Sequence, residues 1–191
     1  MTTLCRATIE ALDQIRSLIA TAQSASSAGS NLYAEFGLGC HVRHVADHFR
    51  ALEAGIESGV VDYNQRRREC ALEHNAEAGL TEIRELIEWL VQIDLHAGSV
   101  IAIESEISCH RTEMRRCNST LDRELLHLIN HTIHHAAYAA LLLRQRGLKP
   151  DQSVGYAPAT SSYLRGTNEE ADRAMVYLYR PAAAHAECRK P

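Results

Sequence analysis

The chain has 191 residues, of which 46% are hydrophobic, so it is long enough for one domain with a continuous apolar core. Its formal net charge is −4, with 20 basic and 24 acidic residues spread along the chain, which argues against partners such as nucleic acid or an anionic membrane. The sequence lacks an apolar run of about 18 residues, and its N-terminal segment lacks the apolar stretch of a signal peptide. We therefore expect a cytoplasmic protein.

The six cysteines are scattered along the chain and form no C-x-x-C pair. This spacing indicates reduced thiols in a cytosolic protein rather than a disulfide framework. Cys40 stands directly before a histidine. Its thiol is either a neighbour of a functional site or a packed side chain.

Hydrophobic periodicity predicts four long helices, because apolar residues recur three and four positions apart. The second ends at Gly59, where a left-handed C-terminal cap belongs, and the fourth ends before Gly147 and Pro150. Residues 24–39 and 60–73 are predicted to be connections. The predicted helices span residues 3–23, 40–58, 76–95 and, beginning at Ser119 or Thr120, up to Arg146.

Residues 98–118 depart from the helical period and are rich in β-branched side chains, which predicts a short β-hairpin before the last helix. The predicted fold class is therefore all-α, a four-helix bundle with this hairpin. We expect the bundle to occupy residues 1–150. Residues 151–191 are expected to form a C-terminal extension that packs on the bundle or is partly flexible.

Histidine is the informative residue type, since seven of the 11 histidines lie in residues 40–49 and 126–136. His131 and His135 are one helical turn apart, the spacing that lets two imidazoles bind one ion. A third histidine from the facing second helix would complete a three-histidine site with open positions, as in catalytic zinc sites. Nickel, iron and copper also accept nitrogen ligands, so residue type does not select the metal. The alternative is a chance clustering of ordinary histidines.

Several neighbouring side chains are weaker candidates for the same site. His48 and His127 lie on the same helical faces and could be extra ligands or hydrogen-bond donors. Asp47 could accept a hydrogen bond from a ligand's free N–H, or it is simply solvated. Tyr138 either lines the cavity with its hydroxyl or packs. The remaining histidines are interpreted as ordinary surface or core residues: His41, His74, His96, His110, His134 and His185.

Two classes of metalloenzyme are excluded by the residues around the last histidines. His131 and His135 have no adjacent Glu of the kind that serves as base in H-E-x-x-H proteases. Residues 125–143 contain no Glu or Asp, whereas a di-iron carboxylate site needs Glu-x-x-His pairs on two helices.

The segments GLGCHVRHVADHFRAL and LLHLINHTIHHAAYAALLLRQRG resemble the DinB/YfiT-like superfamily over roughly the first 150 residues. The matching motifs are His44-Val45-Ala46-Asp47 and His131-Thr132-Ile133-His134-His135. The resemblance implies an up-down-down-up bundle, often a homodimer, that binds one divalent ion of nickel, zinc or iron. It assigns the metal ligands as His44, His131 and His135. Ala137 stands where related sulfoxide synthases have Glu, which argues against an iron oxygenase site.

The leading functional hypothesis is a metal-dependent S-transferase that acts on a small-molecule substrate, a low-molecular-weight thiol. A metal-dependent hydrolase is the second hypothesis. The third is a non-catalytic metal-binding or stress-response protein with a closed site, in which His48 is a fourth ligand. The basic run Arg66, Arg67 and Arg68 is interpreted as a solvated connector, with the binding of an anionic substrate group as the alternative.

Overall fold

The computed structural model describes residues 1–27, 29–93 and 98–166. The chain divides into two compact units, Met1–Gly155 and Tyr156–Pro191. The described part of the second unit contains helix α7 (Pro158–Gly166), and the other helices and strands belong to the first unit. None of the described helices is long and apolar enough to span a membrane. The predictions for residues 167–191 lie outside the described residues.

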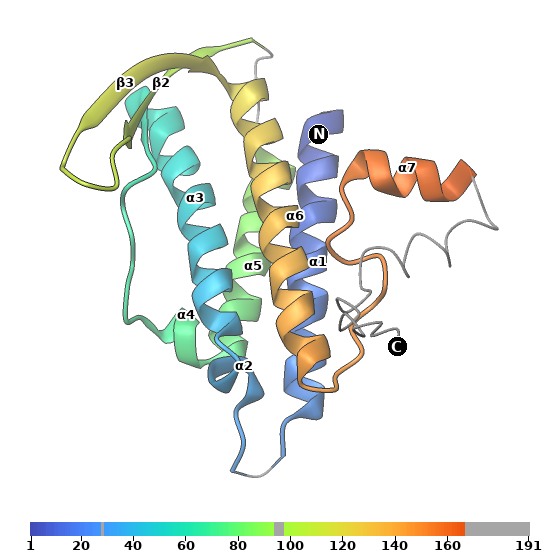
Figure 1. Cartoon of the computed structure of the whole chain (residues 1–191). Coiled ribbons are helices and arrows are strands. Elements are labelled where there is room, and N and C mark those ends of the chain that lie inside the picture. Colours follow the sequence, from blue (N-terminus) through green and yellow to red (C-terminus); the bar gives the residue numbers. More distant parts are fainter. Residues whose placement is uncertain (28, 94–97, 167–191) are drawn as a thin grey trace, which may run out of the picture. The chain divides into compact units, whose positions relative to one another are not determined.

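The first unit is dominated by long helices that pack side by side (Figure 1). The first of them contacts the last two, and the second also contacts the last two. Short helices α2 (Leu32–Glu35) and α4 (Ala71–His74) lie in the connections. The long helices are α1 (Thr3–Ala25), α3 (Leu38–Ser58), α5 (Ala76–Gln92) and α6 (Leu121–Gln145).

The helix boundaries follow from local capping chemistry. Thr2 accepts a hydrogen bond from the Cys5 backbone N–H at 3.1 Å, and Thr120 accepts one from the Arg123 N–H at 3.3 Å, so both satisfy a free donor of a first turn. Gly59 ends α3 with φ 78°, a left-handed conformation that favours glycine. The predicted end of the second helix is therefore confirmed.

The helices bury a continuous apolar core, as their periodicity predicts. The connection of residues 24–39 also contributes to this core, because Tyr33 on α2 is fully buried and its hydroxyl donates to the Leu72 carbonyl at 2.6 Å. Val154 is buried as well, and the Gly155 N–H donates to the Gln14 side chain at 2.8 Å. The start of the predicted extension thus packs within the first unit.

A three-stranded sheet accompanies the helices, with strand order β1-β2-β3. Its strands are β1 (Val60–Asp62), β2 (Val100–Glu106) and β3 (Met114–Thr120). Strands β2 and β3 pair antiparallel, whereas β1 pairs parallel to β2 with Val61 opposite Ile103. The predicted hairpin is confirmed, and the fold is mostly helical with a small sheet, to which β1 adds a strand that was not predicted. Strand β1 lies in a segment that was predicted to be a connection. It was not predicted as a strand because three residues are too few to show an alternating pattern.

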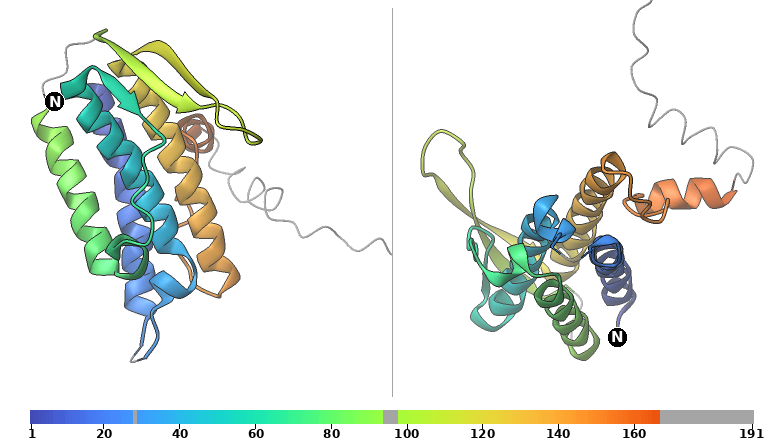
Figure 2. Two further views of the ribbon diagram at one scale, coloured as in Figure 1. Left: turned by 90° about the vertical axis from the view of Figure 1, so that its left-hand side faces the viewer. Right: turned by 90° about the horizontal axis from the view of Figure 1, so that it is seen from below.

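The sheet is fixed to the helices at two points. Strand β1 begins directly after Gly59, and β3 leads directly into α6 at Leu121. The sheet therefore lies where α3 ends and α6 begins (Figures 1 and 2). Buried Val61, Ile101 and Ile103 join it to the main core.

Candidate metal centre

Six histidines meet where α3 packs against α6, and we call them the histidine cluster. Each helix contributes three residues spaced three or four apart, so that they share the face directed at the other helix. Their rings form a connected series along this contact. The centroid distances are 5.3 Å for His41–His135, 4.7 Å for His135–His44, 5.0 Å for His44–His131, 4.2 Å for His131–His48 and 5.6 Å for His131–His127.

Within the described residues, His44, His48 and His131 have ligand nitrogens within 4.8 Å of one another. Nitrogens on one tetrahedral zinc ion lie about 3.4 Å apart, since each is about 2 Å from the ion. Modest rotation of the three rings would therefore bring them to one ion. His44 and His131 were expected in this group, whereas His48 was expected only as an extra ligand.

The backbone sets the tautomer of His48. Its Nδ1 lies 3.0 Å from the His44 carbonyl oxygen. Because a carbonyl can only accept, Nδ1 carries the proton and Nε2 has a free lone pair. His48 thus presents the nitrogen that a metal ion needs.

The donor atoms of the cluster fit a cation. His131 Nε2 is buried and has no hydrogen-bond partner among the residues described, a costly state for a ring nitrogen unless a ligand satisfies it. Burial, then neighbouring histidines, lowers the pKa of His44 to about 3 and that of His131 to about 2. Burial likewise lowers the pKa of His48 to about 4. The three imidazoles are therefore neutral at pH 7 and able to bind a metal.

His135, the third ligand implied by the resemblance, lies beside this group. Its ring centroid is 4.7 Å from that of His44 and 4.6 Å from that of His131. Its Nδ1, however, lies 3.1 Å from Nδ1 of His41, so one of these two rings donates to the other. His41 was interpreted as an ordinary histidine, although its position three residues before His44 placed it on the same helical face.

Asp47 has a different role from the one considered for it. Its buried carboxylate accepts from Arg43 Nη1 at 3.0 Å and from Arg67 Nε at 2.7 Å, rather than from a histidine. Burial raises the pKa of Asp47, but the hydrogen bonds from Arg67 and Arg43 outweigh it and leave the pKa below its usual value. Glu82 in turn bonds Arg50 and Arg67. Asp47 therefore ties the chain after β1 to α3.

Tyr63 and Glu124 support the cluster and were not found from the sequence. The Tyr63 ring stacks on His48 with a centroid distance of 5.2 Å, and it meets His127 edge-on at 5.5 Å. Its hydroxyl donates to the fully buried Glu124 at 2.7 Å. Glu124 also accepts from Arg123 at 2.9 Å. No spacing signal links these residues, because the parallel pairing of β1 brings them together.

Tyr138 and Cys40 lie toward the outside of the site. Tyr138 is 49% exposed, and its ring lies 4.9 Å from that of His41. Cys40 is exposed, although it precedes His41 directly. The Tyr138 ring is thus on the His41 side of the histidine cluster.

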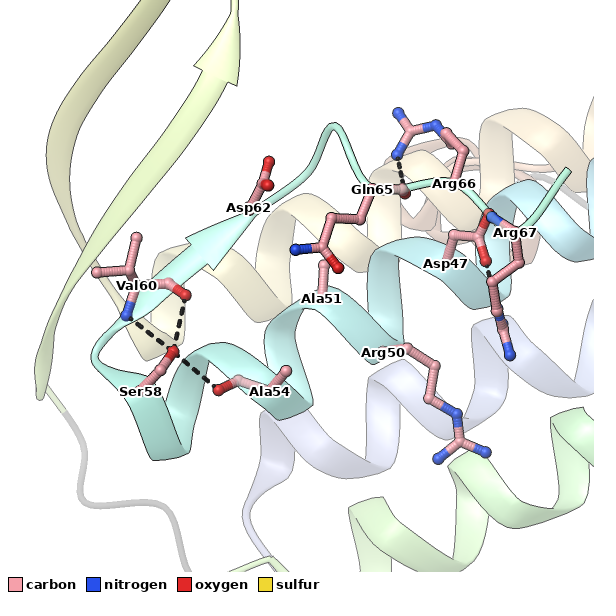
Figure 3. Close-up of a pocket in the computed structure, with 10 residues that line it drawn as sticks. All are labelled: Asp47, Arg50, Ala51, Ala54, Ser58, Val60, Asp62, Gln65, Arg66 and Arg67. Carbon is pink, nitrogen blue, oxygen red and sulfur yellow. Dashed lines mark hydrogen bonds and ion pairs between the residues drawn. The ribbon is translucent and has the colours of Figure 1, made fainter.

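Two cavities flank the segment that follows β1. One of about 460 Å³ is lined by His48, His131, Tyr63 and residues of the β2–β3 hairpin. The other, of about 410 Å³, lies between α3 and residues 60–67, with Arg50 and Asp47 among its lining residues (Figure 3). The first connects the histidine cluster to a space large enough for a small molecule.

The DinB family model matches residues 12–163, which is most of the chain. Comparison with curated proteins and with solved structures gave no match. The resemblance carried by the two histidine motifs is thus confirmed. The chain belongs to the DinB family.

Proposed function

We propose that the histidine cluster binds one divalent metal ion of the nickel, zinc or iron type. The observation that carries this proposal is the buried Nε2 of His131, which has no hydrogen-bond partner in the described part of the chain and lies within reach of the ligand nitrogens of His44 and His48. Family membership supports His135 as a further ligand. His135 reaches the group once its ring turns away from His41.

We infer that the four long helices follow the up-down-down-up connectivity implied by the resemblance. In the chain, residues 60–70 connect α3 to α5, and in Figure 1 they return along the length of α3 before α5 begins. This supports a parallel orientation of α3 and α5. The resemblance also supports a homodimer, which light scattering coupled to size-exclusion chromatography would detect.

For the reaction, we propose transfer of a small thiol to an electrophilic substrate. A bound divalent ion lowers the pKa of a coordinated thiol, so that thiolate is present at neutral pH. The protein's own contribution is to keep the imidazoles neutral by burial and to hold His48 through its bond to the His44 carbonyl. The Tyr63 ring stacks on the His48 ring and is fixed by its hydrogen bond to Glu124. The adjoining cavity of about 460 Å³ accommodates the substrate.

A non-catalytic metal-binding role is the second candidate, and one observation favours it. Four histidines, His44, His48, His131 and His135, lie close enough together to surround an ion. Four protein ligands close a site, whereas three leave a position for substrate. Metal-dependent hydrolysis of esters or amides without added thiol is the remaining enzymatic alternative.

The first experiment is elemental analysis of the purified protein beside its His131→Ala variant. His110→Ala is the control, because His110 is exposed and lies in the segment between β2 and β3. We expect about one equivalent of metal in the parent and in the control, and none in His131→Ala. Equal, negligible metal in all three proteins would refute the proposal.

The metal-loaded protein is then assayed with a panel of thiols and electrophiles. Conjugation that depends on the thiol supports a transferase. Turnover without thiol supports a hydrolase, and tight metal binding without any turnover supports the non-catalytic role.

A further inference from the structure

The arginines near the histidine cluster differ in their partners. Three of them belong to a set that we call the arginine–carboxylate network: Arg43 bonds Asp47 at 3.0 Å, Arg50 bonds Glu82 at 2.9 Å, and Arg67 bonds Asp47 at 2.7 Å. Each of these cations is neutralised within the protein. Arg66 is the exception.

Arg66 has no carboxylate within ion-pair distance in the described part of the chain. Its Nη1 donates to the backbone carbonyls of Tyr63 and Gln65, which are neutral acceptors, and the carboxylates of Asp47 and Asp62 act on it only from beyond ion-pair distance. Figure 3 shows the Arg66 and Arg67 side chains leaving the backbone in opposite directions, with Arg67 directed at Asp47 and Arg66 away from it. The sequence run of three arginines therefore contains residues with different surroundings.

The half-buried Arg66 lies between the two cavities and lines both, and in the one of about 460 Å³ it is joined by His48 and His131. The charge of Arg66 acts on the cluster. The pKa of His44 is lowered mainly by burial, then by the neighbouring histidines, and then by Arg66. Glu106, which is exposed, is the carboxylate among the residues that line this cavity. An unpaired guanidinium thus lies beside the neutral imidazoles that are proposed to hold the metal.

We propose that this cavity binds a small thiol that carries a carboxylate, with the carboxylate paired to Arg66 and the sulfur toward His48 and His131. This inference rests on the proposed function, in which the substrate is a small thiol. It adds that the protein selects thiols that carry an acidic group. Arg66 is the specificity-determining residue. Arg67 and Arg68 do not share this role, since Arg67 is paired with Asp47 and Arg68 is exposed and outside this lining.

The charges of the lining favour a carboxylate over a phosphate. A guanidinium presents a planar set of donors that matches a carboxylate with two parallel hydrogen bonds. A phosphate would bring up to two negative charges to a cavity with a single arginine and with Glu106 on its wall. A single carboxylate balances Arg66 without a second cation.

The test measures thiol binding to the cobalt(II)-loaded protein from the thiolate-to-cobalt absorption in the near ultraviolet. The probes are 3-mercaptopropionate and the neutral 3-mercaptopropanol, which are similar in length. We expect the protein to bind the acidic thiol about tenfold more tightly, the size expected for one charge-assisted hydrogen-bonded pair. Arg66→Met should remove this preference, and Arg66→Lys should keep part of it.

Arg68→Met is the matched control, because it removes the same charge from a neighbouring exposed position and should keep the full preference. Thermal unfolding of each variant checks that it is folded. Equal affinity for both thiols in the parent, or an unchanged preference in Arg66→Met, overturns the assignment of Arg66 and leaves the thiol-binding function intact. Absence of the band with both thiols overturns the proposed function, and this inference with it.

Discussion

Asp47 and His48 are neighbours on α3, yet their side chains lie in opposite electrostatic surroundings. Asp47 faces the arginine–carboxylate network, where each charge has a partner. His48 belongs to the histidine cluster, where neutral rings contact one another and the buried Nε2 of His131 has no hydrogen-bond partner among the described residues. One helix thus carries a face whose charges are paired within the protein and a face whose histidines could hold the proposed metal ion. The following predictions test that difference.

The largest effect is expected from Asp47→Asn. The substitution keeps the shape of the side chain but removes the buried charge that Arg43 and Arg67 share, so that Arg43 retains only Glu73 and Arg67 only Glu82. We expect the free energy of unfolding to fall by about 2 kcal/mol, measured by urea denaturation. Glu53→Gln is the control, because its pair with Arg50 is partly exposed and should be worth less than about 1 kcal/mol. Equal losses in the two variants would contradict the interpretation of Asp47.

In metal-free protein, the contributions of the two faces to the free energy of unfolding should also be lost in different pH ranges. The pKa values of His44 and His48 are lowered, so below about pH 6.5 the unfolded chain binds protons that the folded chain does not. Stability should therefore fall as the pH falls from about 6.5 to about 4. The pKa of Asp47 is also lowered, so its contribution should be lost only at still lower pH.

Urea denaturation at a series of pH values measures this profile. A His131→Leu variant should show a shallower decline between pH 6.5 and 4, because it removes one of the titrating rings. A profile of the metal-free protein that is flat in this range would contradict the burial of neutral histidines.

Tyr63→Phe tests the support behind the histidine cluster. The change removes the hydroxyl that donates to buried Glu124 and keeps the ring that stacks on His48. We expect a loss of about 1 kcal/mol in the free energy of unfolding with metal binding retained. Tyr138→Phe should have no measurable effect on stability, since that side chain is 49% exposed.

The smallest effect, and the one of opposite sign, is expected from His131→Leu in metal-free protein at pH 7. Leucine replaces the half-buried ring, whose buried Nε2 has no partner among the described residues, with an apolar side chain. We expect a gain of less than about 1 kcal/mol, together with loss of metal binding. A large loss of stability without metal would show that His131 has a structural role of its own.

The sequence predicted the elements that depend on local spacing. Apolar periodicity located the four long helices, and the interval of one turn between His131 and His135 placed both on the face directed at α3. The cluster of histidines between two helices follows from these patterns. His41 was interpreted as an ordinary histidine, although it lies three residues before His44 and therefore on the same helical face.

The remaining parts depend on contacts between distant segments. Tyr63 lies beside Glu124 because β1 pairs with β2. A strand of three residues carries no sequence pattern that predicts this pairing. Asp47 meets Arg67 because the chain after β1 returns along α3. Both His48 and His135 lie beside His44, and which of them offers a nitrogen to the group of His44 and His131 depends on ring rotation, which residue spacing cannot specify.

The β2–β3 hairpin lines the cavity in which we propose that the substrate binds, but the proposed metal ligands all lie on helices. The two parts can therefore vary separately. Residues 107–113, between the two strands, form an exchangeable element whose replacement changes the cavity wall without altering α3 or α6. The chain is accordingly a starting point for a library in which one loop is randomised for new substrates on an unchanged helical scaffold.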